Sequence, residues 1–295
     1  MRVENPSRLA PPRLLQPVRD GRSEAEVRRH YLVERELADR LRAAPEALRR
    51  TLYPQIYDEL YRRLPNHPQL RARLQPDAQA RRNRDVDWQF RFLRRALGER
   101  SVFAEIGAGD CALSARVASH VKRVYAIDVS DEIMHNAQRL PNLVPTLSDG
   151  VSIPLPEGCV DVAFSAQLIE HLHPCDAKAQ LANVYRSLAR DGRYFCITPN
   201  RLYGPQDVSG HYEEVASGLH LKEYSARELL QLLRGAGFRA VRFYAGARGR
   251  LVRMPYLVIR AAETALGLLP YRLRKPLASL APMRALLGLY AVALK

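Results

Sequence analysis

Hydrophobic and polar positions follow two different rhythms along the chain. Up to about residue 99, apolar side chains recur every three or four positions, the spacing that gathers them on one face of an α-helix. From residue 102 onward, short apolar runs alternate with helical stretches, which is typical of a sheet whose strands are joined by helices. The sequence therefore predicts a helical N-terminal part followed by an α/β domain.

The N-terminal part contains three predicted helices. The first begins at Ser23, which can form a capping box with Glu26, and the third covers about 85–97. Residues 1–22 are rich in proline and arginine, so we expect a flexible basic tail there. Residues 23–99 then form a helical extension in front of the α/β domain.

Three tyrosines recur beside the apolar stripe of the second predicted helix, at Tyr53, Tyr57 and Tyr61. Such a stripe could line a substrate pocket. Packing between helices is the simpler interpretation, because aromatic side chains at helical spacing are common in cores.

Apolar runs in the second part predict the strands of a mostly parallel sheet. These strands cover 102–106, 123–128, 143–147, 160–166, 193–198 and 240–247, with a last strand within 286–295. Helices are predicted between them, near 112–120, 131–139, 174–189 and 225–236. Alternation of this kind implies helices on both faces of the sheet. The predicted fold is a doubly wound, seven-stranded α/β sheet over residues 100–295.

A tight glycine turn follows the first predicted strand, which ends near Glu105 and leads through Gly107 and Gly109. Glycines let the backbone approach a ligand closely, and the helix that follows presents free N–H groups there. The second strand ends on Asp128, the position where dinucleotide folds hold a ribose. These features predict a cofactor that carries adenosine, without separating NAD from other such cofactors.

Further motifs occur in the same order along the chain: "SDGVSIPLPEGCVDVAFSAQLIEHLHP", "LARDGRYFCITPN" and "ELLQLLRGAGF". Together with the glycine turn they resemble the class I S-adenosylmethionine-dependent methyltransferases, most nearly the branch with the ubiquinone-type O-methyltransferases. The resemblance covers residues 100–247 and the last strand, and it implies S-adenosylmethionine as the cofactor. The sequence departs from the family at Cys111, where a small residue is usual, and at Asp191-Gly192-Arg193, where two glycines are usual.

The resemblance implies nine cofactor-binding residues: Glu105, Gly107, Gly109, Asp128, Val129, Asp149, Gly150, Val151 and Gln167. Glu105 would meet the amino group of the cofactor, and the two glycines of the turn would face its methionine part. Asp128 would hold the ribose hydroxyls and Asp149 the adenine amine, with the next two residues flanking the ring. Gln167 would face the sulfonium.

The resemblance also implies an acceptor pocket lined by His171 and His220. Either imidazole could take a proton as a general base, because its ordinary pKa of about 6.5 lies near working pH. A purely structural role is the alternative for each. Some members of the ubiquinone-type branch bind a divalent metal here through two acids and a histidine. Gln167 replaces the first acid, so no metal is predicted.

The net charge of +15 is divided unevenly. Residues 1–100 hold 23 arginines and 14 acids, which gives +9, and residues 101–240 hold 13 basic and 16 acidic residues, which gives −3. Residues 241–295 hold 10 basic residues against Glu263 alone, which gives +9. Basic ends around a mildly acidic centre fit an anionic membrane or acceptor as well as a nucleic acid.

A helical insertion is predicted over 251–284, between the sixth strand and the last. Its apolar face consists of Met254, Leu257, Val258, Ala261, Ala265 and Leu268, with arginines beside it. Such a segment could lie at a membrane interface or cap an apolar acceptor. The alternative is a helix pair that packs on the sheet or on another subunit.

The predicted function is O-methylation of a small-molecule or a lipid- or glycan-linked acceptor. One alternative is an RNA or nucleotide methyltransferase. It is less favoured because "SAQLIEH" replaces the Asn/Asp-Pro-Pro-aromatic motif of enzymes that act on base amines. Enzymes that methylate pyrimidine C5 need a cysteine nucleophile, and the candidate, Cys175, lies several residues beyond the strand. Another alternative is a protein that binds S-adenosylmethionine without turnover and acts as a partner. The oligomeric state is left open.

The four cysteines form no CxxC pair, which favours reduced thiols in a cytoplasmic protein. The N-terminus has no apolar core of a signal peptide, and no run reaches the ~20 apolar residues of a membrane span. We therefore expect a cytoplasmic protein, peripheral on the inner face of the membrane if it docks there.

Overall fold

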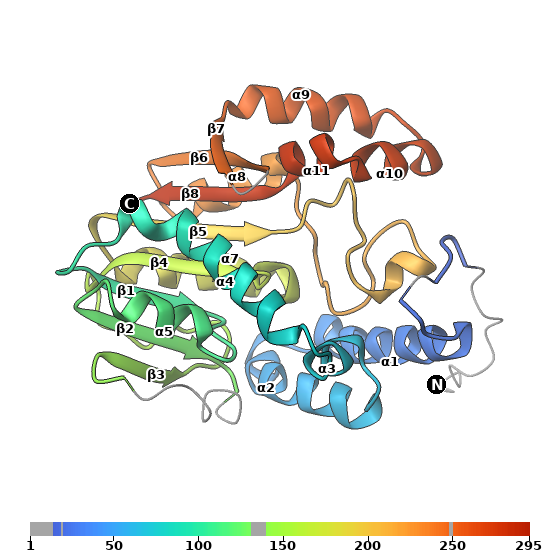
Figure 1. Cartoon of the computed structure of the whole chain (residues 1–295), viewed down its shortest axis with the longest axis horizontal. Coiled ribbons are helices and arrows are strands. Elements are labelled where there is room, and N and C mark those ends of the chain that lie inside the picture. The colour runs from blue at the N-terminus through green and yellow to red at the C-terminus, as the bar shows by residue number, and fades with distance from the viewer. Residues whose placement is uncertain (1–13, 19, 131–139, 248–249) are drawn as a thin grey trace.

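An eight-stranded sheet forms the centre of the computed structural model, which describes residues 14–18, 20–130, 140–247 and 250–295 (Figure 1). Its strands are β1 Val102–Ile106, β2 Arg123–Asp128, β3 Leu143–Leu147, β4 Val160–Ala166, β5 Leu188–Thr198, β6 Ala240–Ala247, β7 Arg250–Met254 and β8 Leu289–Leu294. They lie in the order β3-β2-β1-β4-β5-β8-β6-β7. Neighbours from β3 to β5 are parallel, and β8 is antiparallel to both β5 and β6.

Side chains of successive strand residues point to opposite faces of the sheet, and each face has its own core. Phe103 and Phe164 belong to one core with α4 Ala78–Leu93 and α5 Ala112–Ala118. Ala104 and Ala163 belong to the other, with α7 Pro174–Ser187 and α8 Ala226–Gly235. The predicted doubly wound α/β fold is therefore confirmed.

The N-terminal helices are α1 Glu24–Ala43, α2 Glu46–Arg63 and α3 Pro68–Arg73. The predicted capping box is confirmed: the Glu26 N–H donates to Ser23 Oγ over 3.2 Å, and the Ser23 N–H donates to Glu26 Oε2 over 2.7 Å. Figure 1 shows these helices at the end of the sheet to which β1, β2 and β5 point. They thus lie where parallel α/β sheets bind ligands.

Several predicted boundaries are wrong. The third predicted helix corresponds to α4, which begins at Ala78 rather than near 85, because its first turns, "AQARRNR", offer no apolar periodicity. Strand β5 begins at Leu188, five residues before the predicted 193. The sheet has eight strands instead of seven, because residues 250–254 at the start of the predicted helical insertion pair with β6 as β7. The predicted helix over 131–139 and residues 1–13 and 19 of the predicted tail lie outside the described residues.

After β7 the chain forms α9 Tyr256–Gly267, α10 Tyr271–Ser279 and α11 Ala281–Leu287, and then enters β8. Figure 1 shows the three helices together beside β6, β7 and β8. Among the described residues, no helix combines the length and the apolarity that a bilayer crossing requires.

Candidate active site

The turn after β1 has a backbone that only glycine adopts without strain at two positions. Gly107 and Gly109 have φ angles of +74° and +51°. A Cβ at Gly107 would lie 3.1 Å from a Leu168 methyl group, whereas a Cβ at Gly109 would meet none of the described residues within 4 Å. As far as the described residues go, one side of Gly109 is therefore open, as a ligand on this turn requires.

Asp128, at the end of β2, stabilises the same turn. Its Oδ2 accepts the Gly109 N–H over 2.8 Å, and its Oδ1 accepts the N–H groups of Val129 and Ser130 over 2.7 and 3.1 Å. A carboxylate has about four lone-pair positions, so three N–H donors leave room for a further donor on Oδ2. The arrangement fits the predicted contact with a ribose hydroxyl.

Glu105 lies at the buried end of β1, where Ser114 Oγ donates to its carboxylate over 2.6 Å. Burial raises the pKa of Glu105 to about 8, although the Ser114 hydrogen bond opposes the rise. An ammonium group beside this carboxyl would favour its charged form. The site therefore fits the predicted contact with the amino group of the cofactor.

The predicted adenine residues lie under α2. Asp149 Oδ1 accepts two N–H groups of its own turn, and Oδ2 accepts Ser152 Oγ over 2.9 Å and the Arg50 guanidinium over 3.1 Å. Gly150 has a φ of +87°, and Tyr53 lies 3.2 Å from where its Cβ would be. An adenine amine would have to displace Arg50 to reach the Asp149 carboxylate, since four donors already surround it.

The remaining two predicted cofactor residues differ in exposure. Val151 is fully buried in the core, so it can support the adenine ring of the cofactor only as part of the core beneath it. Gln167 is exposed at the end of β4, where its φ is +52° and its N–H donates to the Ile197 carbonyl over 2.8 Å. The side chain of Gln167 thus stays available at the carboxyl edge of the sheet.

The two predicted histidines come together just beyond β4. The ring centroids of His171 and His220 lie 4.8 Å apart, and Glu170 offers a carboxylate oxygen within 4.8 Å of both. Glu170 is fully buried; Thr198 Oγ1 donates to its Oε2, and its Oε1 has no hydrogen-bond partner. Sequence analysis predicted that the two histidines line this site.

Hydrogen bonds orient His171. Its Nδ1 lies 3.0 Å from the Leu219 carbonyl and 2.9 Å from Tyr57 Oη. A carbonyl oxygen can only accept, so the His171 Nδ1 carries the proton and Nε2 retains a lone pair. Burial, reinforced by the charge on His220, lowers the pKa of His171 to about 3. His171 is therefore neutral at neutral pH.

His220 has the opposite charge state. Its Nδ1 lies 2.8 Å from Glu223 Oε1, and its backbone N–H donates to Asp207 Oδ2. Burial alone would lower the pKa of His220, but the Glu223 hydrogen bond and the nearby carboxylates raise it to about 9. Burial also raises the pKa of Glu170 to about 7. A divalent cation fits poorly here, because a metal ligand must be deprotonated and the nearby carboxylates keep His220 protonated.

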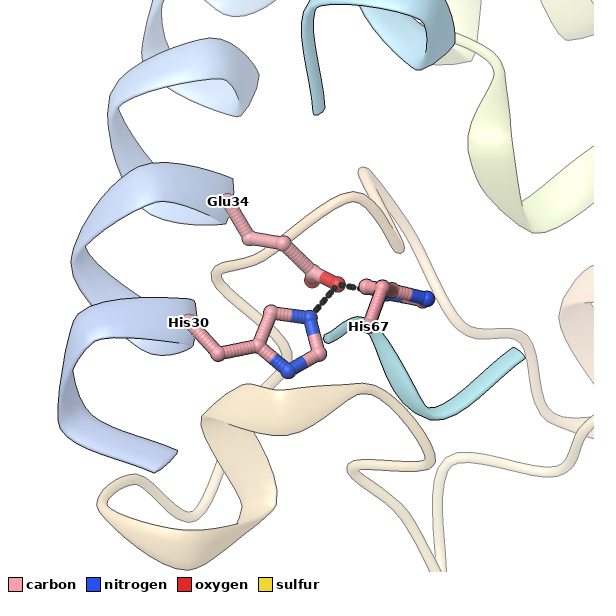
Figure 2. Close-up of side chains that lie close together, drawn as sticks. All are labelled: His30, Glu34 and His67. Carbon is pink, nitrogen blue, oxygen red and sulfur yellow. Dashed lines mark hydrogen bonds and ion pairs between the residues drawn. The ribbon is translucent and has the colours of Figure 1, made fainter. Parts of the chain in front are cut away.

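A second group of this kind lies in the N-terminal helices, where His30 and His67 face Glu34 (Figure 2). His30 Nε2 lies 2.7 Å from Glu34 Oε1, and His67 Nε2 lies 3.8 Å from the same atom. Arg22 and the Gln69 N–H donate to the two Nδ1 atoms. With Nδ1 accepting, each ring in its neutral form carries its proton on Nε2. The Nε2 of His30 is hydrogen-bonded to Glu34, whereas the Nε2 of His67 has no hydrogen-bond partner among the described residues.

Glu34 connects this group to the segment that carries His220. Its Oε2 accepts the Leu219 N–H over 3.3 Å. Burial opposes the charge of Glu34, but His30, which is hydrogen-bonded to it, and the nearby His67 lower its pKa to about 2. Arg42, also on α1, donates to the carbonyls of Ser217 and Gly218. The pattern of α1 in the sequence gave no signal for these contacts, because their partners are about 180 residues away.

A hollow of about 570 Å³ lies elsewhere, between α4 and strands β5, β6 and β8. Trp88 and Phe92 of α4 contribute to it, together with arginines of α4, β5 and β6. None of the predicted site residues is part of its lining. It is therefore separate from the predicted cofactor and acceptor sites.

Comparison with known proteins agrees with the fold and the turn. Residues 104–196 match a family described as "Methyltransferase domain". A probable S-adenosylmethionine-dependent methyltransferase of Mycolicibacterium smegmatis is 30% identical over 135 residues, 45% of this chain and 50% of that protein. The protein Rv3030 of Mycobacterium tuberculosis, also named a probable S-adenosylmethionine-dependent methyltransferase, is 30% identical over 45% of this chain and 47% of its own length.

Among solved structures, a putative methyltransferase in complex with the Haloferax volcanii Trm112 methyltransferase activator has a TM-score of 0.53. It is 17% identical, and the match covers 73% of this chain and 92% of that one. This likeness concerns the fold. The chain spans about half the length of the curated relatives it matches.

The fold and the glycine turn define a class I methyltransferase domain. Residues 104–196 of this domain match the methyltransferase family, the relatives are named as S-adenosylmethionine-dependent methyltransferases, and S-adenosylmethionine is the cofactor. When bound, the cofactor supplies an electrophilic methyl group. The roles of the nine predicted cofactor residues and of the two histidines stay predictions.

Proposed function

We propose that the chain transfers a methyl group from S-adenosylmethionine to a hydroxyl oxygen of a small-molecule or a lipid- or glycan-linked acceptor. The observation that supports this is the contact between the glycine turn and the segment after β4. Leu168 packs on Gly107, and His171 follows three residues later. A methyl donor on the glycine turn and an acceptor beside the segment after β4 would therefore lie side by side, which is the arrangement that the transfer needs.

In the proposed reaction, the acceptor oxygen forms a bond to the methyl carbon as the carbon–sulfur bond breaks and its electron pair stays on sulfur. The hydroxyl proton must go to a base. His220 is protonated and cannot serve. We therefore propose that the His171 Nε2, which keeps a lone pair but has a pKa of about 3, accepts the proton only in passing and transfers it to a stronger neighbouring base. Glu170, whose pKa is about 7, is the neighbouring carboxyl that can share the proton.

The test is transfer of labelled methyl groups from S-adenosylmethionine to extracts, followed by identification of the labelled product. We expect label in a small molecule, lipid or glycan. His171→Ala should lower turnover by about 10²–10⁴-fold while cofactor affinity is unchanged, because a general base acts in the chemical step. His173→Ala serves as the control, since that ring caps α7 through the Cys175 N–H.

Three outcomes would contradict the proposal. Label found in RNA alone would favour the nucleic-acid alternative. Cofactor binding without any transfer would favour a non-catalytic partner. Turnover of His171→Ala equal to that of the parent would remove this imidazole from the mechanism and leave proximity as the source of catalysis.

A further inference from the structure

The helices between β7 and β8 expose an unusual amount of apolar surface. Of fourteen large apolar side chains that the described residues expose, seven lie within 252–280. We call the exposed apolar side chains of α9 and α10, with the residue that follows, the outer face: Leu257, Val258, Ala261, Ala265, Leu268, Leu273, Leu277 and Leu280. Leu257 is 74% exposed and Leu268 is 83% exposed. Apolar patches of this kind on a folded protein mark interaction sites.

The apolar stripe of α9 faces solvent because a polar anchor fixes the helix. Glu263, on its inner side, is buried, and its Oε1 accepts the Asn200 amide and the Ala226 N–H, each over 2.7 Å. Ile259 and Leu266 are buried beside it. Rotating α9 to bury Leu257 and Leu268 would remove Glu263 from both hydrogen bonds. The exposure is therefore built into the packing of the helix.

The exposed charged side chains of α9, α10 and α11 are all basic. Arg253, Arg260, Arg272 and Arg284 are exposed on or next to the three helices. The acidic side chain of residues 241–295 is that of Glu263, and it is buried. An apolar face edged by arginines is complementary to an anionic surface with an apolar interior.

We propose that α9 and α10 dock this protein on an anionic phospholipid bilayer, with the leucines of the outer face at the headgroup–acyl boundary and the arginines on lipid phosphates. A helix in this position lies in the plane of the interface and does not cross it. Its attraction for the bilayer falls as salt rises, because ions screen exposed charges.

The helices that carry the docked face contact the loop after β5, and Gln206 of that loop donates to Glu223, the partner of His220. Lys275 of α10 donates to the Gly204 carbonyl over 3.2 Å. Leu202 packs with Leu266 of α9 and Ala278 of α10. Docking would thus hold the acceptor side of the protein near the lipid surface. That last step rests on the proposed function, whereas docking itself requires no methyl transfer.

The test is co-sedimentation of the full chain with phosphatidylcholine vesicles and with vesicles that also contain phosphatidylglycerol. We expect pelleting with the anionic vesicles alone and its loss at high salt. Leu257→Ser with Leu268→Ser should reduce pelleting at least tenfold, and Arg253→Glu with Arg260→Glu should do the same. Leu74→Ser is the matched control, because Leu74 is 85% exposed and lies at the end of α3.

Each variant is first shown to bind S-adenosylmethionine like the parent, so a loss of pelleting cannot come from misfolding. Equal pelleting with both kinds of vesicle, or with neither, would overturn the proposal. So would a parent that sediments as a dimer and becomes a monomer with the leucine substitutions, since the outer face would then be a subunit interface. Failure of methyl transfer would leave the vesicle result unaffected, which separates the two proposals.

Discussion

His171 and His220 hold opposite charge states although their rings are 4.8 Å apart. The difference comes from what each ring faces. His220 contacts the carboxylate of Glu223, which stabilises its proton, whereas His171 faces a carbonyl oxygen and a tyrosine hydroxyl. Two like charges at this distance would repel each other. The pair therefore holds one positive charge, on His220, while the His171 Nε2 keeps its lone pair.

The first prediction concerns these charge states. In an NMR titration, His220 should stay protonated until about pH 9 and His171 should stay neutral down to about pH 3. Glu223→Gln should lower the pKa of His220, because the hydrogen bond to a carboxylate is what favours its charge. A His220 that titrates near its ordinary 6.5 in the parent would contradict this interpretation.

The same shifts set how stability depends on pH. The folded-state pKa of His220 lies above its ordinary 6.5, so the stability that its proton contributes is complete below pH 6.5 and is lost as the pH rises through about 9. For His171 the folded-state pKa is lower than 6.5. The unfolded chain then gains the proton first, and stability falls as the pH drops from 6.5 toward 3.

The second prediction concerns Asp128. Asp128→Ala should weaken S-adenosylmethionine binding by about 1–3 kcal/mol, the range of a hydrogen bond to a charged group left unmade. Isothermal titration measures it, with Glu157→Ala as the control because Glu157 is exposed. Asp128→Asn should lose less, because the amide oxygen can still accept the Gly109 N–H. Parent-like affinity of Asp128→Ala would refute the ribose assignment.

At the scale of elements, α2 is attached to the start of α7 by a buried ion pair. The Arg49 guanidinium donates to both carboxylate oxygens of Asp176 over 2.5 and 2.8 Å, and Tyr53 Oη donates to the same group over 2.7 Å. Asp176 is fully buried. This attachment places Tyr57, one turn further along α2, on His171. The tyrosine stripe therefore fits both interpretations of the sequence. It packs between helices, and through Tyr57 it also orients His171 in the site.

The third prediction follows from this ion pair. Asp176→Ala should destabilise the protein by about 3–5 kcal/mol, because it leaves the Arg49 charge buried without a partner. Replacing both Arg49 and Asp176 by leucine should cost less than the single change. Arg239→Ala is the control: its ion pair with Asp191 is exposed and should contribute less than about 1 kcal/mol. Urea unfolding measures all four proteins, and equal costs for Asp176→Ala and Arg239→Ala would contradict the argument.

How well the elements could be predicted depends on how local their signals are. Strands β1 to β4 have the bounds that their apolar runs predict. For β1 and β4 the reason is burial, because a buried parallel strand needs a continuous apolar run, whereas β3 at the edge of the sheet is largely exposed. The glycine turn and Asp128 were also predictable, since they are set by chain neighbours. The contacts of Arg50 with Asp149 and of Glu34 with Leu219 were not, because they join residues about 100 and 185 positions apart.

At the scale of the whole molecule, the N-terminal helices share a core with the α/β domain. Tyr53 and Ile56 of α2 belong to the same buried cluster as Val184 of α7 and Leu229 of α8. Independent domains each have a core of their own. The helical extension is therefore expected to fold with the sheet and not beside it, and the candidate site between them forms only when both are in place.

The last prediction tests this cooperativity with two probes. Trp88, the one tryptophan of the chain, lies on α4 with its ring centroid 6.0 Å from that of Tyr290 on β8, so its fluorescence reports on packing against the sheet. Far-UV circular dichroism includes the 20 residues of α1 and the 18 of α2. In urea the two signals should fall together, as in any two-state transition.

Saturating S-adenosylmethionine should shift both signals equally, because it binds the folded state and stabilises it by about 2.7 kcal/mol at a hundredfold excess over Kd. A circular dichroism signal that falls before the fluorescence would show that α1 and α2 unfold separately. In that case Tyr57 and Arg50 would separate from the site while the sheet remained folded. Cofactor affinity would then be lost when α1 and α2 unfold, before the sheet unfolds.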